Sequence, residues 1–342
     1  MSALPEHKLS TIIDQAHEKK AESFRPHFGV SQLGHSCDRY LWLNFRWAIA
    51  SSFPGRMLRL FRRGHLEEET VIADLRAIGC ALNERQTKVE FGSFVSGSCD
   101  GIITGGLPGY ENKKLVLEIK THSKKSFDEL VKKGVHLAKE QHYIQMQGYM
   151  LGLGIDRALY YAVCKDDDRI HTEIIRLDLE LAKKYVERGK KIALSDYMPE
   201  PLSADPSWYQ CKMCSFHTFC FESKLTKEVN CRTCALVTAT TDSQFLCARH
   251  DNAEVPVEFQ RQGCEGHVLH PDLVPYERAE STSDFEAVYI IDGQHVRNGE
   301  PDERVFSSKE IIADPGACAR PDEVVDSLRQ EFNAKIIENN SF

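Results

Sequence analysis

Asp100 and the segment Glu118-Ile119-Lys120 are the residues of this chain best suited to chemistry. Because residues two apart in a strand face the same side, we expect Glu118 and Lys120 to project together from LVLEIKT. Carboxylates are hard oxygen ligands for Mg²⁺ or Mn²⁺, and such an ion usually keeps open positions for water and phosphate. The set therefore predicts a site where an ion activates water against a phosphate ester, with Lys120 stabilising the charge that develops.

Two helical segments carry polar residues that can complete this site. His65 and Glu68 are one turn apart on the same face of the first segment, and Gln145 and Tyr149 are spaced i, i+4 on the second. Taken alone, each pattern also has a simpler interpretation. A Glu–Lys pair on a strand is often a solvated face, and a Gln-x3-Tyr pair is often the polar edge of a buried helix.

The order of these residues resembles that of a known family. The chain carries Gly-x3-Glu, Asp, Glu-x-Lys and Gln-x3-Tyr in turn, which is similar to the motifs of the PD-(D/E)XK nuclease superfamily in its RecB-like branch. The resemblance covers roughly residues 30–225. The residues that match the motifs are Gly64, Glu68, Asp100, Glu118, Lys120, Gln145 and Tyr149.

The resemblance implies a role for each motif residue. Asp100 and Glu118 would bind the Mg²⁺ or Mn²⁺ ion, Lys120 would serve catalysis, and the Gln-x3-Tyr helix would help to place the DNA strand. Members of this branch often carry histidine at the position of Glu68. The helix is therefore expected to supply the ion with Glu68 or, as the less favoured alternative, His65.

Four cysteines flank these motifs. Cys211, Cys214 and Cys220 form a C-x2-C-x5-C pattern, and Cys37, more than 170 residues earlier, is the natural fourth ligand of one metal centre. The arrangement resembles the CRISPR-associated RecB-like exonucleases and the AddB-type recombination nucleases. That resemblance implies a 4Fe–4S cluster that joins the two ends of the nuclease domain. Zinc held by the three clustered cysteines with Cys37 or His217 is the alternative that spacing leaves open.

A second group of metal-ligand residues lies in the last third of the chain, where one C-x2-C pair is followed by two C-x2-H pairs. Repeated pairs of this kind are typical of a zinc site. We expect Cys231, Cys234 and Cys247 to be ligands, with Cys264 preferred over His250 as the fourth. This tail resembles the small zinc modules attached to phage or prophage nucleases, which implies binding of substrate or partner.

The N-terminus lacks the hydrophobic stretch of a secretory signal, and no apolar run approaches the ~18 residues that span a membrane. We therefore expect a cytoplasmic protein without a membrane segment. In that reducing compartment, twelve cysteines indicate metal rather than disulfides. Four cysteines stand alone and are predicted to be small buried or semi-buried residues, namely Cys80, Cys99, Cys164 and Cys318.

A net charge of −8 is unusual for a protein that simply coats nucleic acid. Any contact with DNA must then depend on basic groups gathered locally in a groove. Residues 56–63 hold four arginines and residues 113–139 hold eight lysines, which suits such a groove but also suits solvated helix faces.

Hydrophobic periodicity indicates the elements that position these residues. Helices are predicted over residues 1–22, 36–50, 56–79, 126–154, 179–195 and 321–336. Strands are predicted over residues 88–91, 94–104, 114–121, 157–164, 170–177 and 286–291. The buried stripe of the helix over 56–79 is predicted to be Leu58, Phe61, Leu66, Val71, Leu75 and Ile78.

These elements predict an α/β fold with a mixed, restriction-endonuclease-like sheet flanked by helices. The predicted domains are a nuclease domain closed by the iron–sulfur cluster over 1–227 and a zinc-binding accessory domain over 228–342. The expected reaction is metal-dependent hydrolysis of DNA, and the resemblance makes it exonucleolytic on single-stranded or end-bearing DNA.

The favoured setting is phage-type recombination or DNA processing, with a single-strand annealing or other recombination protein as a partner. The long tail argues against a CRISPR adaptation nuclease that trims spacers. A catalytically silent DNA-binding scaffold is the other alternative. It would leave the intact set of Asp100, Glu118 and Lys120 without a chemical reason.

Overall fold

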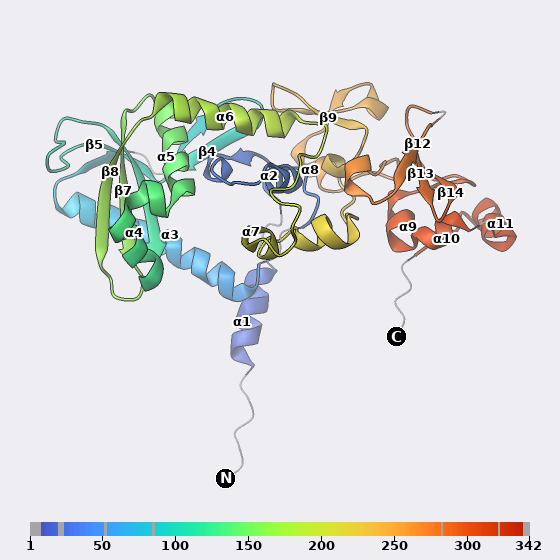
Figure 1. The fold of residues 1–342 in the computed structure, drawn as a ribbon, viewed down its shortest axis with the longest axis horizontal. Helices are drawn as coiled ribbons and strands as arrows, with labels where there is room; N and C mark the ends of the chain where they lie inside the picture. The colour runs from blue at the N-terminus through green and yellow to red at the C-terminus, as the bar shows by residue number, and fades with distance from the viewer. Residues whose placement is uncertain are drawn as a thin grey trace, which may run out of the picture. The chain divides into compact units, whose positions relative to one another are not determined.

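The structure is a computed structural model with two compact units. The residues it describes are 8–19, 24–50, 53–83, 86–281, 283–320 and 322–337. The first unit contains Met1–His35 and Ser51–Lys191, and the second contains Ser36–Ala50 and Ile192–Phe342 (Figure 1). Across the described ranges, no helix has the length and apolar character needed to span a membrane.

A five-stranded mixed sheet forms the centre of the first unit, in the order β2-β5-β6-β7-β8. The strands are β2 (Ala81–Asn83), β5 (Gly101–Gly105), β6 (Leu115–His122), β7 (Arg157–Cys164) and β8 (Ile170–Arg176). The β6–β7 pair is parallel and the other neighbours are antiparallel. The predicted mixed α/β architecture is therefore confirmed.

The segment 94–104 was predicted as one strand, but it forms two strands in two sheets. A three-stranded sheet has the order β1-β4-β3. Its strands are β1 (Phe28–Gly29), β4 (Val95–Cys99) and β3 (Thr87–Glu90). The chain changes sheets at Asp100, whose side chain accepts a hydrogen bond from the Ile119 amide at 2.7 Å. The backbone pairing of β5 with β6 ends at Leu117. Beyond that point the Asp100 carboxylate, in place of a backbone carbonyl, accepts the hydrogen bond of the Ile119 amide.

The helices of the first unit are α1 (Leu9–Glu18), α3 (Gly55–Ala77), α4 (Lys124–Ala138), α5 (Glu140–Leu153) and α6 (Leu179–Leu194), which runs on into the second unit. The rest of the helix predicted over residues 1–22 falls largely outside the described residues.

The helix predicted over 126–154 is in fact divided into α4 and α5. Gly134 adopts a φ of 75°, which glycine tolerates, and Lys139 is non-helical at φ −142°. The Val135 amide donates to Glu173 at 3.0 Å, which compensates for the interrupted helical bonding.

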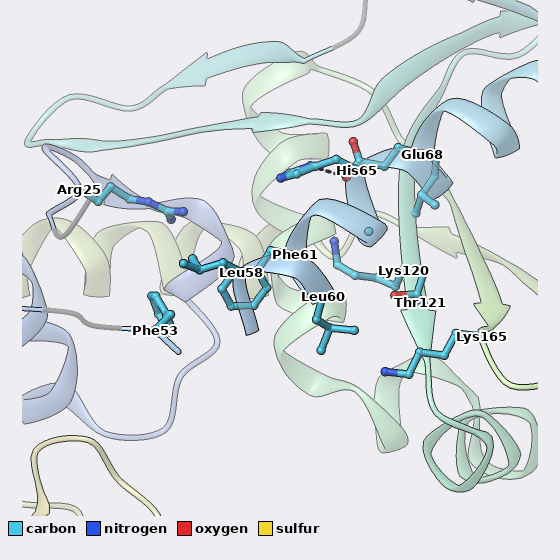
Figure 2. A pocket seen from close by; sticks show the side chains of 12 residues that line it. Arg25, Phe53, Leu58, Leu60, Phe61, His65, Glu68, Lys120, Thr121 and Lys165 are labelled. Atoms are coloured by element: carbon cyan, nitrogen blue, oxygen red, sulfur yellow. Dashed lines mark ion pairs between the residues drawn. The ribbon is translucent and has the colours of Figure 1, made fainter. Parts of the chain in front are cut away.

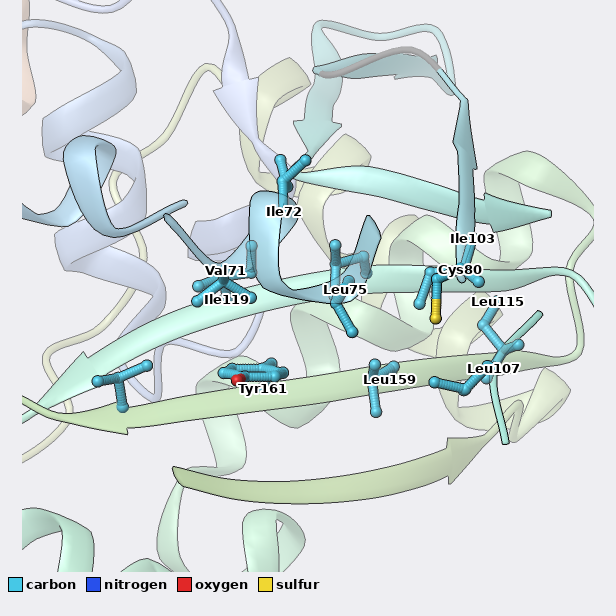
Figure 3. Close-up of a cluster of buried hydrophobic side chains, with 12 residues drawn as sticks. Val71, Ile72, Leu75, Cys80, Ile103, Leu107, Leu115, Ile119, Leu159 and Tyr161 are labelled. Carbon is cyan, nitrogen blue, oxygen red and sulfur yellow. The ribbon is translucent and has the colours of Figure 1, made fainter. Parts of the chain in front are cut away.

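The end of α3 packs against one face of the main sheet. Val71, Ile72 and Leu75 join a buried cluster with Ile119 and Tyr161 from β6 and β7 (Figure 3).

The lone cysteines are buried, as predicted: Cys80, Cys99, Cys164 and Cys318.

The first half of α3 does not follow the predicted buried stripe. Phe61 and Leu66 are 42% and 57% exposed, and Ile78, just after the helix, is 60% exposed. Those positions of the prediction are wrong. Phe61 and Leu66 precede the turns of α3 that meet the sheet, and Ile78 lies beyond the end of the helix. Helical periodicity identifies a face of a helix, but it does not show what covers that face.

The second unit contains α2 (Asp38–Phe45) and two small antiparallel-rich sheets, with the orders β11-β10-β9 and β12-β13-β14-β15. Its strands are β9 (Val237–Ala239), β10 (Phe245–Cys247), β11 (Ala253–Glu254), β12 (Glu277–Ala279), β13 (Ala287–Ile291), β14 (Gln294–Asn298) and β15 (Val305–Phe306). Its remaining helices are α7 (Tyr209–Lys212), α8 (Val257–Gln260), α9 (Ser308–Ala313), α10 (Pro315–Ala319) and α11 (Glu323–Phe332).

A buried arginine explains why residues 36–50 belong with the C-terminal part of the chain. Arg232 is fully buried, and its guanidinium lies 3.9 Å from the centre of the Trp47 ring. It also donates to the Phe45 carbonyl at 3.0 Å, so the cation is both hydrogen-bonded and in contact with aromatic rings. This division differs from the boundary predicted near residue 227. The functional roles predicted for the two parts remain predictions.

Candidate active site

The strand β6 holds Glu118 in a fully buried position beside Lys120. Glu118 is 0% exposed, and Lys120 is ion-paired with it. Apart from the contact of Oε1 with the Lys120 ammonium, neither carboxylate oxygen of Glu118 has a hydrogen-bond partner among the described residues. Burial raises the pKa of Glu118 to about 8, although the Lys120 charge opposes this rise. The simpler interpretation of this pair as a solvated surface face is therefore wrong.

Two further carboxylates share this environment. Burial raises the pKa of Asp100, and the charge of Lys120 opposes that rise. Burial and then the charge of Asp100 raise the pKa of Glu68, which reaches the site from α3. The charges of Asp100 and Glu68 also raise the pKa of Glu118. Three carboxyl groups thus lie close enough to disfavour one another's ionisation, which a bound cation would relieve.

The structure distinguishes between the two candidate ligands of α3. Glu68 is 18% exposed and interacts electrostatically with Asp100 and Lys120. His65 is 75% exposed, and its Nδ1 lies 3.4 Å from the Glu68 carboxylate. Glu68 therefore faces the other carboxylates, while His65 lies beside it at the exposed side.

The helix α5 brings Gln145 and Tyr149 to the same site. Both side chains are buried, and Gln145 Nε2 donates to the Tyr149 hydroxyl at 3.2 Å. Burial, followed by the charge of Glu118, raises the pKa of Tyr149 above its usual value. Tyr149 therefore lies near Glu118 and keeps its proton at any ordinary pH.

A polar network that the sequence analysis did not identify borders this set. The Tyr160 hydroxyl lies 2.9 Å from His122 Nε2 and 2.9 Å from His142 Nδ1. Because a hydroxyl has one proton, Tyr160 donates to at most one of the two histidines and accepts from the other or from both. Burial lowers the pKa of His122 to about 4 and that of His142 to about 3, with the Lys120 charge contributing in both cases.

One sequence signal could have indicated part of this network, namely the helical spacing of His142. His142 precedes Gln145 and Tyr149 at i, i+3, i+7, one face of a helix. Tyr160 is the partner of Glu118 in the parallel β6–β7 register, which the sequence alone does not specify.

Glu68 and Lys120 line a cavity of about 690 Å³ in the first unit (Figure 2). One side of the cavity is a single face of α3. The residues that line it are Arg25, Phe53, Leu58, Leu60, Phe61, Gly64, His65, Glu68, Ile119, Lys120, Thr121 and Lys165. The charged residues thus open onto a space large enough for a ligand.

In the described part of the chain, no group of three or more His, Cys, Asp or Glu side chains is already arranged to hold a metal ion. The chemistry of the donor set nevertheless fits a hard divalent ion. The set consists of carboxylates, and the buried Glu118 has no hydrogen-bond or ion-pair contact besides Lys120 among the described residues.

The four cysteines predicted to hold an iron–sulfur cluster line one small cavity of the second unit. The Sγ of Cys37 accepts from the Tyr40 amide at 3.4 Å, and the Sγ of Cys214 accepts from the Phe216 amide at 3.4 Å. Burial raises the pKa of Cys214, and the charges of Cys220, Cys37 and Cys211 add to this rise. The structure therefore brings together four soft sulfur donors from both ends of the motif region. Such donors fit iron or zinc.

The cysteines of the tail also lie near one another. Burial raises the pKa of Cys231 to about 12, and the charges of Cys234, Cys264 and Cys247 contribute. The Cys234 Sγ accepts from two backbone amides, those of Leu236 at 3.5 Å and Val268 at 3.4 Å.

The histidines of the tail have other positions. His250 is exposed, and so is Cys264. His267 is buried, and its Nδ1 lies 2.7 Å from the Ser308 hydroxyl. That hydrogen bond gives His267 a structural role.

No protein-family model matches the chain, and no curated protein matches it. Its similar solved structures include SSO0001, at 17% identity and a TM-score of 0.39, covering 63% of this chain and 97% of that one. They also include the alkaline exonuclease LHK-Exo from Laribacter hongkongensis, at 16% identity and a TM-score of 0.38, covering 53% and 90%. A phage-related exonuclease from Haemophilus somnus 129PT has 20% identity and a TM-score of 0.36, covering 52% and 96%. We therefore base the functional assignment on the site itself.

Proposed function

We propose that this protein is a Mg²⁺- or Mn²⁺-dependent nuclease that hydrolyses DNA phosphodiester bonds. The observation that carries the proposal is Glu118, a fully buried carboxylate that has no compensating contact besides the Lys120 ammonium among the described residues. Together with Asp100 and Glu68 it makes three carboxylates to one lysine, and such a surplus of negative charge in a buried site is costly unless a further cation compensates it. Asp100 and Glu68 share its environment, and Lys120 lines the adjoining cavity.

A divalent ion bound by Glu68, Asp100 and Glu118 would polarise the phosphodiester and acidify a water molecule. Burial alone would lower the pKa of Lys120, but the charges of Glu118 and Asp100 raise it above its usual value. Lys120 therefore stays cationic and acts by stabilising negative charge on the phosphate, not as a general base.

The helix α5 contributes uncharged side chains that can position the DNA strand. Tyr149 remains a neutral hydroxyl, and its oxygen is held by Gln145 at 3.2 Å. These two side chains therefore suit the placement of the DNA strand against the carboxylates. The motif order further supports an exonuclease for single-stranded or end-bearing DNA, in phage-type recombination or DNA processing with a single-strand annealing protein as partner.

The cysteine clusters complete the proposal. Cys37, Cys211, Cys214 and Cys220 would hold a 4Fe–4S cluster that supplies a structural link within the second unit. The cysteines of the tail, Cys231, Cys234, Cys247 and Cys264, would hold one zinc ion with a structural role.

Purified protein is expected to shorten end-labelled DNA only when Mg²⁺ or Mn²⁺ is present. The reason is that the three carboxylates need the ion before Lys120 can act on a phosphate. Linear single strands, circular single strands and blunt duplexes should be compared with Mg²⁺, Mn²⁺ and Ca²⁺. Protein that binds DNA but never cuts it, with each ion and end type, would instead indicate a silent DNA-binding scaffold.

A further inference from the structure

Two exposed phenylalanines lie in the cavity at a distance from the charged residues. Phe53 and Phe61 are each 42% exposed, and their ring centres are 5.2 Å apart at an interplanar angle of 81°. Figure 2 shows Phe53, Leu58 and Phe61 grouped apart from His65 and Glu68. Large aromatic rings are usually buried, so this pair leaves apolar surface facing the cavity.

The helix α3 connects this aromatic pair to the carboxylates. Leu58, Phe61, His65 and Glu68 follow one another at helical spacing and all line the cavity. At a rise of 1.5 Å per residue, Phe61 and Glu68 are about 10 Å apart along the helix axis. This distance corresponds to roughly three nucleotides at a stacked spacing of about 3.4 Å.

Between the two ends, α3 leaves the cavity open. A Cβ added to Gly64 would meet no atom within 4 Å, although Gly64 lines the cavity. A strand can therefore pass along this face of the helix between Phe61 and Glu68. Cationic side chains accompany the route, since Arg25, Lys120 and Lys165 line the same cavity.

We propose that Phe53 and Phe61 form a stacking site for one unpaired base of a DNA strand whose phosphate lies at Glu68, Asp100 and Glu118. This inference rests on the proposed function and deepens it by naming the substrate class as a strand with unpaired bases. Every base has an aromatic face, so stacking of this kind does not depend on sequence. Bases inside a duplex already stack on each other, so the site favours single strands over paired DNA.

The test is the double variant Phe53→Leu/Phe61→Leu, which keeps apolar side chains and removes both rings. DNA binding is measured in Ca²⁺ with oligonucleotides that carry 2-aminopurine, whose fluorescence falls when the base stacks. We expect wild type to quench the probe in a single strand, and the double variant to lose this quenching. Single-strand affinity should fall about 5- to 150-fold, the range for loss of one stacked base.

Affinity for a hairpin-capped duplex should not change, because it depends on phosphate contacts that the variant retains. A matched control is Phe332→Leu, which changes a phenylalanine that is 71% exposed on α11. This control should leave both affinities at the wild-type values. Gly64→Leu should fill the open part of the cavity and weaken single-strand binding without lowering the thermal midpoint, since leucine favours helix more than glycine does.

Unchanged single-strand binding in the double variant overturns the inference, as does an equal loss for single-stranded and hairpin-capped DNA. A different result would disprove the proposed function. If wild-type protein quenches the probe but never cuts DNA, the base-stacking site is supported and the nuclease activity is not. If the double variant binds and cuts single strands like wild type, the nuclease activity is supported and the base-stacking site is not.

Discussion

Lys120→Ala is expected to reduce DNA cleavage by on the order of 10³-fold while DNA binding in Ca²⁺ persists. The lysine is the cation paired with Glu118, and it stays protonated because the charges of Glu118 and Asp100 raise its pKa. Glu118→Ala is expected to be at least as severe, since it removes a ligand of the ion. Because these groups act as one unit, the double variant should lose little more than either single variant.

Matched controls lie on the same helix as Glu68. Glu68→Ala should reduce cleavage strongly, because Glu68 interacts with Asp100 and Lys120. Glu67→Ala and Glu69→Ala remove the same charge one residue away and should remain within a few-fold of wild type. Cleavage by Lys120→Ala at the wild-type rate would place the active site elsewhere in the chain, or trace the activity to a contaminant.

The second large effect concerns the two cysteine clusters, which we expect to lose their metals independently. Protein purified without oxygen should contain about four iron atoms and one zinc atom per chain. Cys37→Ser should remove the iron and keep the zinc, whereas Cys234→Ser should remove the zinc and keep the iron. Elemental analysis with the brown colour of the cluster distinguishes these outcomes.

The free energy of unfolding should decrease when the iron–sulfur cluster is lost. Cys37 joins residues more than 170 positions away, so the loss of the cluster releases a long loop. We expect Cys37→Ser to cost about 3 kcal/mol, a fall of roughly 10 °C in the thermal midpoint. The second unit should still fold, because Arg232 holds Phe45 and Trp47 without the cluster. Zinc with no iron in wild-type protein at the first cluster would contradict the iron–sulfur assignment.

The main sheet and its helices could be predicted from periodicity, because their segments are long and regular. Predicted strand 114–121 corresponds to β6 (Leu115–His122), and predicted helix 56–79 corresponds to α3 (Gly55–Ala77). Breaks within such segments were missed. One predicted strand is interrupted at Asp100, and one predicted helix is interrupted from Gly134 onward. In both cases the hydrogen bond that compensates for the break joins residues far apart in sequence, Asp100 with Ile119 and Val135 with Glu173.

The candidate site was predictable in its residues but not in its environment. Strand alternation put Glu118 and Lys120 on one face, yet the complete burial of Glu118 depends on α5 and β7, which come later in the chain. Phe61 shows the converse case. Its helical spacing predicted burial, and the structure leaves it in the cavity, because a helix face is equally suited to a core and to a binding groove.

The position of residues 36–50 also depends on contacts between distant parts of the sequence. Composition changes near residue 227 suggested a domain boundary there. The fold instead packs Phe45 and Trp47 around Arg232 within one compact unit. The aromatic partners precede the arginine by more than 180 residues, so nothing local in either segment indicates the contact.

The central claim, that the buried Glu118 carboxylate holds a divalent ion, is tested most directly by Mn²⁺ binding. Free Mn²⁺ can be followed by electron paramagnetic resonance for wild type and Glu118→Gln at pH 6, 7 and 8. Because the Glu118 pKa is raised to about 8 by burial, the carboxyl is protonated at pH 6 and must release its proton when the ion binds.

We therefore predict that the wild-type affinity for Mn²⁺ rises about tenfold from pH 6 to pH 7 and about fivefold from pH 7 to pH 8, where the pH reaches the pKa of the carboxyl. Glu118→Gln preserves the size of the side chain but cannot ionise, so it should bind about 100-fold more weakly at pH 8. Its affinity should also depend less on pH. Equal Mn²⁺ affinity in wild type and Glu118→Gln at every pH would contradict the account.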